Sequence, residues 1–181
     1  MAKKIVLYIA MTLDGFIAKK DGSVDFLDKY NESGEDYGYK IFYKSVDSII
    51  IGNTTYRQFG EKKEFMDYYK DKPIFVFSKK NNVTKNKENI SFVNEDVESF
   101  CRKLKYNNTW LMGGGSILKS FLDKDLVDEF IITIMPELLG SGIRLFQSEK
   151  AFNQLRIKDI KTFKMNVVQI TYAKKENQNW I

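Results

Sequence analysis

The chain of 181 residues is 43% hydrophobic and 14% aromatic, so it can bury a sizeable core in one domain. It contains no histidine and a single cysteine, which excludes Ser–His and Cys–His nucleophiles, internal disulfides and the common imidazole metal sites. The net charge of +5 comes from scattered lysines, and the longest apolar runs are too short to cross a bilayer. We therefore expect a cytoplasmic protein that binds neither nucleic acid nor membrane and holds no metal.

Apolar segments rich in β-branched residues alternate with segments of helical spacing along most of the chain. The predicted strands are 5–9, 48–51, 74–77, 90–93, 110–112 and 129–134, and the predicted helices are 35–45, 54–59, 96–106 and 116–123. Strand and helix in repeated succession predict an α/β fold, with a central, mostly parallel sheet and helices on both faces.

The end of the chain departs from this alternation. Segments 156–160 and 167–172 have strand character without a helix between them, and 164–166 is predicted as their turn. We expect an antiparallel strand pair added to the sheet, which makes the sheet mixed. No linker or repeat marks a boundary, so 1–175 is predicted as one domain, and the tail 176–181 is expected to fray.

The predicted strand 48–51 runs into Gly52 and then into a hydroxyl-rich helix start, formed by Asn53, Thr54 and Thr55. The threonines can cap the helix without any ligand, which is a very common role. The turn also suits a phosphate, because free N–H groups at a helix N-terminus point at the anion and glycine leaves room for close approach.

The predicted strand 74–77 ends in Ser78, Lys79 and Lys80. Ligands of open α/β sheets bind at the carboxyl ends of the strands, where these groups can hold a phosphomonoester such as a ribose 2′-phosphate. Taken alone, the segment fits a solvated lysine pair equally well.

The predicted strand 110–112 meets the helix 116–123 at Gly113, Gly114 and Gly115. A glycine-rich turn can serve only to pack a strand against a helix, and for this turn alone that interpretation and phosphate binding are balanced. The similar turn at Gly52 favours phosphate binding. We expect the two turns to face each other across the sheet and to hold a pyrophosphate from both sides.

Five segments in a fixed order resemble the dihydrofolate reductase superfamily, and they are 9–18, 52–56, 76–79, 112–116 and 128–142. Within it, Leu13-Asp14-Gly15 and Pro136…Leu139-Gly140-Ser141-Gly142 are similar to the RibD carboxy-terminal branch, the reductase of riboflavin biosynthesis and its stand-alone relatives. The resemblance covers residues 4 to 173. It implies a dihydrofolate reductase-like three-layer fold, NADPH as cofactor and a homodimer.

The resemblance also assigns roles to residues. Those expected to contact NADPH are Ala10, Gly15, Ile17, Gly52, Asn53, Thr54, Thr55, Ser78, Lys79, Met112, Gly113, Gly114, Gly115 and Ser116. By the same resemblance Gly140, Ser141 and Gly142 are expected to contact the substrate, and Asp25 and Phe26 are expected to reach it from the loop that follows the first strand. Relatives usually carry arginine in place of Asn53, so the expected preference for NADPH over NADH rests on Lys79 and Lys80.

Two carboxylates are candidates for a catalytic role, Asp36 and Asp14. In folate-reducing members a carboxylate on the first long helix hydrogen-bonds the pterin ring, and Glu35 and Asp36 lie at the start of the corresponding predicted helix. Acidic residues there can equally serve the helix dipole, an interpretation that is favoured for Glu35 and balanced for Asp36. Asp14 can instead shape the turn at Gly15.

The resemblance implies an NADPH-dependent reductase that acts on a small nitrogen heterocycle, with 5-amino-6-(5-phosphoribosylamino)uracil as the leading substrate. The alternatives are a dihydrofolate reductase acting on dihydrofolate or pterins, and a non-catalytic NADPH-binding protein. Hydride transfer needs little acid–base machinery from the protein, so the absence of histidine is no obstacle.

Overall fold

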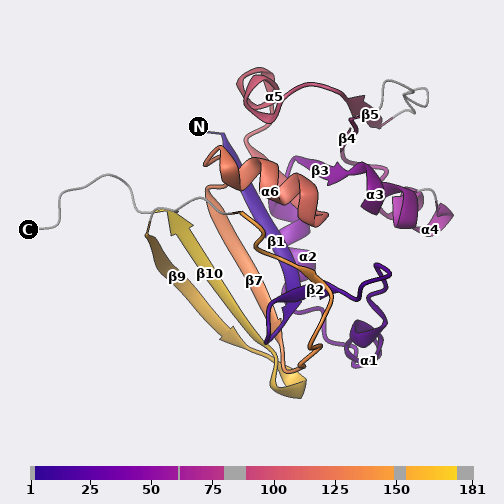
Figure 1. The fold of residues 1–181 in the computed structure, drawn as a ribbon, viewed down its shortest axis with the longest axis vertical. Coiled ribbons are helices and arrows are strands. Elements are labelled where there is room, and N and C mark those ends of the chain that lie inside the picture. The colour runs from indigo at the N-terminus through magenta and orange to yellow at the C-terminus, as the bar shows by residue number, and fades with distance from the viewer. Residues whose placement is uncertain (1–2, 61, 80–88, 149–153, 175–181) are drawn as a thin grey trace, which may run out of the picture.

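The computed structural model describes residues 3–60, 62–79, 89–148 and 154–174 (Figure 1). The main sheet has the strand order β5-β4-β3-β6-β1-β7-β10-β9, and β2 and β8 form a separate two-stranded ribbon. The strands are β1 (Lys4–Thr12), β2 (Phe16–Ala18), β3 (Ser48–Gly52), β4 (Ile74–Phe77), β5 (Ile90–Val93), β6 (Asn108–Gly113), β7 (Glu129–Met135), β8 (Ile143–Arg144), β9 (Leu155–Thr162) and β10 (Val168–Lys174). The helices are η1 (Asp25–Leu27), α1 (Asp28–Asn31), α2 (Tyr39–Ser45), α3 (Asn53–Thr55), η2 (Tyr56–Gly60), α4 (Lys63–Tyr68), α5 (Val97–Lys103), α6 (Gly115–Asp123) and η3 (Lys164–Asn166).

The strands from β5 to β7 in the sheet order are all parallel, and β10 joins β7 in the antiparallel direction. β9 pairs antiparallel with β10 and forms the margin of the sheet. The predicted α/β fold, with a mostly parallel mixed sheet and an antiparallel terminal strand pair, is therefore confirmed.

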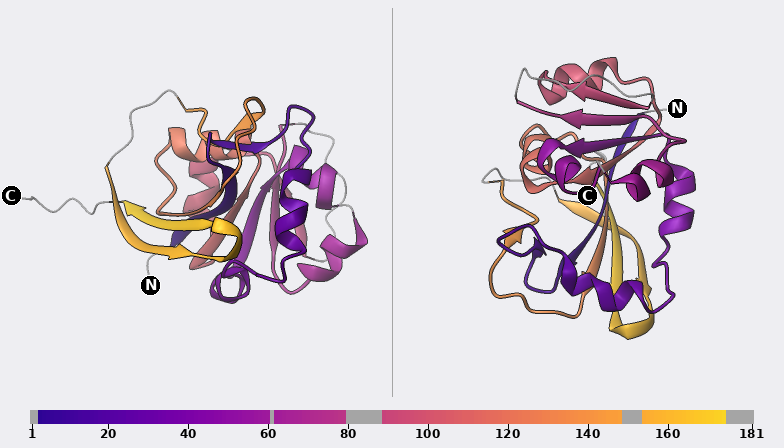
Figure 2. Two further views of the ribbon diagram at one scale, coloured as in Figure 1. Left: turned by 90° about the horizontal axis from the view of Figure 1, so that it is seen from below. Right: turned by 90° about the vertical axis from the view of Figure 1, so that its right-hand side faces the viewer.

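Helices cover both faces of the parallel part of the sheet (Figure 2). Successive side chains of a strand point to opposite faces. Leu7 on β1 therefore packs with Phe100 of α5 and Phe121 of α6. Val6, the preceding residue, packs on the other face in a cluster that includes Phe42 of α2. The two layers of core lie on either side of the sheet, as the three-layer prediction requires.

Three predicted helices differ in their bounds. The helix expected over 35–45 begins only at Tyr39, because Tyr37 and Gly38 have φ angles of 50° and 80°, which an α-helix cannot contain. The helix expected over 96–106 ends at Lys103. The segment 54–59 is the short α3 followed by the π-helical turn η2. The elements β2, β8, η1, α1 and α4 are not predicted from the sequence, because they are too short to show a period.

The expected tail 176–181 and Lys80 lie outside the described residues. Within the described ranges, no helix has the length and apolar character that spanning a membrane requires.

Candidate functional site at the carboxyl edge of the sheet

The main sheet opens at its carboxyl edge between β1 and β6. These strands pair only as far as Leu7 and Leu111, whereas β1 continues beside β7 up to Thr12. The chain leaves β6 toward α6 on one face of the sheet, and it leaves β1 toward α2 on the other face. Neighbouring strands whose connections go to opposite faces form the crevice in which open α/β sheets bind ligands.

The two glycine turns meet at this edge. A Cβ added to Gly114 would lie 2.7 Å from Thr55 Oγ1, and one added to Gly52 would lie 3.5 Å from Gly113 O. Gly113 and Gly114 also have φ angles of 122° and 92°, which other residues rarely adopt. The turns therefore face each other as expected, and their close approach requires glycine even without a ligand.

The polar groups of these turns remain available to an anion. The N-cap residues of α3 and α6 are Gly52 and Gly114, which have no side chain to cap a helix, so the threonines do not occupy the cap position considered for them. Thr54 and Ser116 are exposed, and Asn53 and Met112 are half-buried. The first-turn N–H groups of α6 and the neighbouring hydroxyls fit a phosphate by charge and by hydrogen bonding.

The end of β4 lies at the same edge, beside the Gly52 turn. Gly52 pairs with Phe77, the last residue of β4, so Ser78 and Lys79 follow next to it. The Ser78 N–H donates to Val93 O (3.0 Å), and Lys79 is exposed. The residues expected at the 2′-phosphate are thus neighbours of the residues expected at the pyrophosphate.

Asp14 ties the end of β1 to the loop after β7. Its Oδ1 accepts hydrogen bonds from Thr12 Oγ1 (2.6 Å) and Leu139 N (3.1 Å), and its Oδ2 accepts one from Gly140 N (2.7 Å). The bond from Thr12, reinforced by those from the two backbone N–H groups, holds the pKa of Asp14 below its ordinary value. This carboxylate is ionised and fixes the position of the Gly140 loop. Thr12 is a site residue that has no recognisable signal in the sequence.

The loop with Gly140, Ser141 and Gly142 lies against the Gly15 loop. A Cβ added to Gly142 would collide with Ala18 O, and the following strand β8 pairs with β2. Ile17, in the middle of β2, is half-buried and packs on the core beneath α6. The structure therefore brings residues expected at the nicotinamide and residues expected at the substrate together at one rim of the site, formed by the Gly15 and Gly140 loops.

Arg144 is a cation at this rim that the sequence analysis does not single out. Its guanidinium carbon lies 4.9 Å from the centre of the Phe16 ring, and it forms no ion pair with any residue in the described ranges. Gln147 donates to Arg144 O (2.9 Å), and its amide covers Gly115, where an added Cβ would collide with it. The Arg144 backbone is thereby held beside the N-terminus of α6. In the sequence its only signal is a basic residue shortly after the glycine-rich loop.

The opposite face of β1 carries an apolar cluster at the same end of the strand. Ala10 packs there near Phe26, Tyr30 and Tyr37, so two residues of the predicted site share a cluster. Asp25, the neighbour of Phe26, is exposed and pairs with Lys19 (2.8 Å), whose hydrogen bond lowers the pKa of Asp25.

Tyr30 links this cluster to the start of the Gly140 loop. It is only 3% exposed, and its hydroxyl donates to Glu137 Oε1 (2.6 Å). Burial, together with this hydrogen bond, raises the pKa of Tyr30 to about 12, so the phenol is neutral at physiological pH. Lys29 pairs with the same carboxylate and lowers the pKa of Glu137.

Asp36 lies at the start of α2, on the same face as this cluster. Its Oδ1 accepts from Gly38 N (3.0 Å) and its Oδ2 accepts from Lys40 N (3.2 Å). The bond from Lys40 satisfies an N–H group in the first turn of α2, and the carboxylate lies at the helix end where the dipole favours negative charge, which is the role that the sequence analysis weighed against the catalytic one.

A buried polar network holds the turn after Asp36 against the sheet. Gln169 Nε2 donates to Thr133 Oγ1 (2.9 Å) and to Tyr37 O (3.1 Å), and Tyr8 OH also donates to Tyr37 O (3.0 Å). Burial raises the pKa of Tyr8 to about 12, and the charge of Asp36 acts in the same direction. Neither Tyr8 nor Gln169 stands out in the sequence, because both lie inside ordinary strand patterns.

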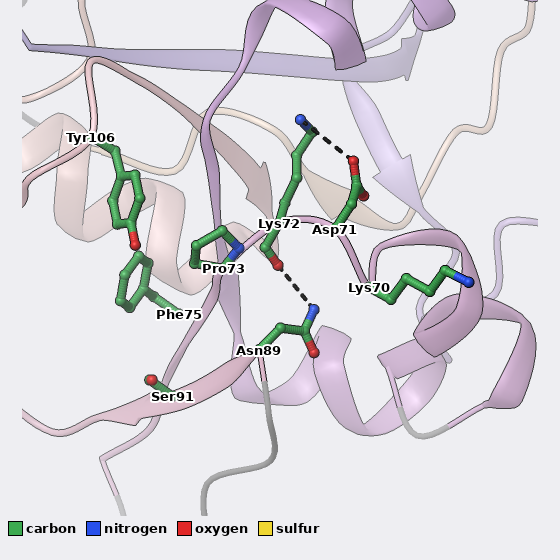
Figure 3. A pocket seen from close by; sticks show the side chains of 8 residues that line it. All are labelled: Lys70, Asp71, Lys72, Pro73, Phe75, Asn89, Ser91 and Tyr106. Atoms are coloured by element: carbon green, nitrogen blue, oxygen red, sulfur yellow. Dashed lines mark hydrogen bonds and ion pairs between the residues drawn. The ribbon is translucent and has the colours of Figure 1, made fainter.

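Two hollows occur near the ends of the sheet. One of about 390 Å³ lies beside the predicted site and is lined by Lys19, Lys20, Asp21, Leu139 and Ser141. The other, of about 320 Å³, lies at the amino end of β4, far along the strand from Ser78. Figure 3 shows that its lysines, Lys70 and Lys72, extend away from Phe75 and Ser91, so their charges do not converge on this hollow.

Comparisons with known proteins agree with this architecture. The chain is 40% identical to the uncharacterized protein YwjB of Bacillus subtilis, over 96% of this chain and 99% of the relative. It is 33% identical to the uncharacterized protein YyaP of the same organism, over 94% of each chain.

Solved structures share the fold. A putative riboflavin biosynthesis protein from Shewanella sp. PV-4 is 27% identical, with a TM-score of 0.79 over 96% of this chain and 99% of that one. The diaminohydroxyphosphoribosylaminopyrimidine deaminase/5-amino-6-(5-phosphoribosylamino)uracil reductase of Thermotoga maritima is 15% identical, with a TM-score of 0.71 over 96% of this chain and 57% of that one. A dihydrofolate reductase from Enterococcus faecalis, complexed with NADP(H), is 13% identical, with a TM-score of 0.66 over 96% and 97%. The model of the RibD C-terminal domain matches residues 3–169, and the chain belongs to this family.

Proposed function

We propose that the protein is an NADPH-dependent reductase that transfers hydride to a small nitrogen heterocycle of the 5-amino-6-(5-phosphoribosylamino)uracil type. One observation carries the proposal. The Gly52 and Gly113–Gly115 turns are in contact where β1 and β6 separate, and the N-cap residue of α6 is Gly114, which has no side chain to cap the helix. Membership of the RibD C-terminal domain family supports a reductase, and the reductase named among its structural neighbours supports the pyrimidine substrate class.

The residues around the two turns bind different parts of the cofactor. In this proposal Gly113 to Ser116 hold the pyrophosphate from one side, and Gly52 to Thr55 hold it from the other. Ser78 and Lys79 take the 2′-phosphate, while Ala10, Gly15 and Ile17 border the nicotinamide. NADPH, when bound, supplies the hydride, and the fold aligns the acceptor and excludes water.

The two candidate carboxylates have different roles in this proposal. Asp14 is ionised and committed to Thr12, Leu139 and Gly140, so it positions the rim on which the substrate rests. Asp36 or solvent then provides the proton to the acceptor. The substrate itself lies between the Asp25–Phe26 segment and the loop with Gly140, Ser141 and Gly142, and the protein is a homodimer.

Cofactor binding is tested by titrating the protein with NADPH and with NADH and following cofactor fluorescence. We expect tighter binding of NADPH, and we expect Lys79→Ala to weaken NADPH binding about tenfold while leaving NADH unchanged, because one charge-assisted hydrogen bond is lost. Lys70→Ala, at the amino end of β4, is the matched control and should alter neither affinity. If neither cofactor binds, the reductase proposal fails.

Acceptor identity is tested by measuring NADPH oxidation with the ribosylaminopyrimidine and with dihydrofolate. Turnover of the pyrimidine supports the proposal. Turnover of dihydrofolate alone replaces it with the dihydrofolate reductase alternative, for which the shared fold is the supporting observation. Tight NADPH binding without turnover of any pyrimidine or pterin supports the non-catalytic alternative.

A further inference from the structure

The hollow of about 390 Å³ beside the predicted site lies between two segments of the chain. Residues 19–21 line one side of it, and Leu139 and Ser141 line the other. The first wall of the hollow is the segment 19–31, which continues from this turn to the end of α1, and the second wall is the loop 136–142.

The two walls meet at the end of β7. Lys19 pairs with Asp25 (2.8 Å), which joins the turn of the first wall to the start of η1. Phe26 and Tyr30 then pack in one cluster with Met135, the last residue of β7. The second wall begins immediately after Met135, so both walls start from the same point of the sheet.

One polar contact joins the walls where they meet. The hydroxyl of Tyr30, on the first wall, donates to Glu137 Oε1, on the second (2.6 Å). Tyr30 is only 3% exposed, so water competes little for this bond. Glu137 is ionised, because Lys29 and then Tyr30 lower its pKa, and a phenol that donates to a carboxylate forms a strong, charge-assisted hydrogen bond.

Further hydrogen bonds hold both partners of this contact. Tyr30 O accepts from Ser33 Oγ (2.6 Å) and from Tyr37 OH (3.3 Å), which fixes the end of α1. Glu137 O accepts from Leu13 N (2.9 Å), which fixes the start of the second wall. The contact between Tyr30 and Glu137 is therefore anchored to the backbone on both sides, so it sets the distance between the walls.

We propose that the hollow is the slot for the acceptor, and that Tyr30 is a positioning residue that sets the width of this slot through Glu137. The inference rests on the proposed function, which places the acceptor between the Asp25–Phe26 segment and the Gly140 loop. A flat heterocycle binds well only when both walls contact it at once, and a gap of a fraction of an ångström at one wall loses much of that attraction. The contact therefore supports affinity for the acceptor and not for NADPH, whose phosphates are assigned to the glycine turns.

The proposal is tested with variants that change the hydrogen bond between the walls. Tyr30→Phe should weaken binding of the ribosylaminopyrimidine about tenfold, measured by calorimetry with and without NADP⁺. It should raise the KM of the pyrimidine by a similar factor, with kcat and the affinity for NADPH nearly unchanged. Glu137→Leu should behave like Tyr30→Phe. Glu137→Gln should retain most of the affinity for the pyrimidine, because its amide oxygen still accepts a bond from Tyr30.

The double variant Tyr30→Phe with Glu137→Leu distinguishes positioning from a general loss of structure. If the two residues act through one contact, the double variant should bind the pyrimidine about as weakly as either single variant, and not about a hundredfold more weakly than wild type. Tyr106→Phe, in the other hollow at the amino end of β4, is the matched control and should leave both affinities unchanged. Circular dichroism shows whether each variant is folded.

The outcomes separate this inference from the reductase proposal. A folded Tyr30→Phe variant with wild-type affinity for the pyrimidine overturns the inference alone, and so do equal losses of affinity for the pyrimidine and for NADPH. If the wild-type protein binds NADPH but neither the pyrimidine nor dihydrofolate, the hollow is no acceptor slot and the inference fails. If it binds the pyrimidine but no cofactor, the reductase proposal fails, and calorimetry still decides the role of Tyr30. Dihydrofolate replaces the pyrimidine as the probe if it alone binds.

Discussion

Gly114 illustrates how two constraints meet at one residue. Its φ of 92° is strained for any residue with a side chain, and an added Cβ would lie 2.7 Å from Thr55 Oγ1. We expect Gly114→Ala to lower the free energy of unfolding by about 2–4 kcal/mol, the sum of backbone strain and a steric contact. Denaturant unfolding measures this loss. Gly34→Ala is the control, because Gly34 has a similar φ of 72° but open space around it. It should cost only about 1–2 kcal/mol, and an equal loss at both positions would contradict the role of the Thr55 contact.

Asp14 makes a pH-dependent contribution to stability. Its pKa in the folded protein is lowered, chiefly by the hydrogen bond from Thr12, below the ordinary value of 3.8. A carboxyl group with a lowered pKa in the folded state contributes fully above its ordinary pKa, and the contribution is lost as the pH falls through the lowered value. We expect Asp14→Asn to reduce the unfolding midpoint at pH 6, and we expect the difference from wild type to shrink near pH 3.

Urea unfolding at the two pH values tests this expectation. Glu64→Gln, on the short helix α4, removes one negative charge far from the Asp14 hydrogen bonds and controls for net charge. A difference between wild type and Asp14→Asn that grows toward low pH would show that the sign of the linkage is wrong.

At the scale of elements, α6 is the helix that presents the glycine turn, and Phe121 anchors it. Phe121 has no exposed surface and packs against the sheet with Leu118 and Leu7. We expect Phe121→Ala to lower the free energy of unfolding by about 3–5 kcal/mol, because it leaves a cavity in the core. Lys119→Ala, on the exposed side of the same helix, removes only a pair with Asp123 and should cost about 0.5 kcal/mol. Comparable losses for the two variants would contradict this assignment of the buried face.

The start of α2 shows that helical spacing in a sequence does not always give the residue at which a helix begins. Helical spacing extends back to Glu35, yet the helix begins at Tyr39. Gln169, far along the chain, holds Tyr37 O against the sheet, and Gly38 takes a left-handed conformation. A contact between residues so distant in sequence cannot be seen in a local pattern, so the start of α2 at Tyr39 emerged only from the structure.

At the scale of the whole molecule, cofactor binding should stabilise the fold. A ligand that binds only the folded state at about 100 times its dissociation constant adds about 2.7 kcal/mol. We expect NADPH to raise the thermal midpoint more than NADH does at equal concentration, and we expect Lys79→Ala to reduce this difference. Scanning calorimetry or thermal fluorescence measures both midpoints. Equal shifts of the thermal midpoint from the two cofactors in the wild-type protein would show that the 2′-phosphate contributes nothing measurable to the affinity.

Much of the fold can be predicted from the sequence, because it depends on local hydrophobic periodicity and on the residues that end strands and helices. The strands of the parallel sheet, the antiparallel terminal pair and the glycine-rich strand ends all carry such signals, and the comparisons confirm the family that they indicate. The predicted site segments also converge on one edge, since the carboxyl ends of parallel strands must lie together.

The chain's own sequence determined the strands of the main sheet and that their glycine-rich ends lie at one edge, because hydrophobic period and backbone freedom are properties of neighbouring residues. The tertiary structure alone decided that Asp14 holds the Gly140 loop, that Arg144 lies beside α6 and that Gln169 holds the turn before α2. Each of these depends on groups that are distant in sequence and meet only when the sheet has formed, so no local pattern records them.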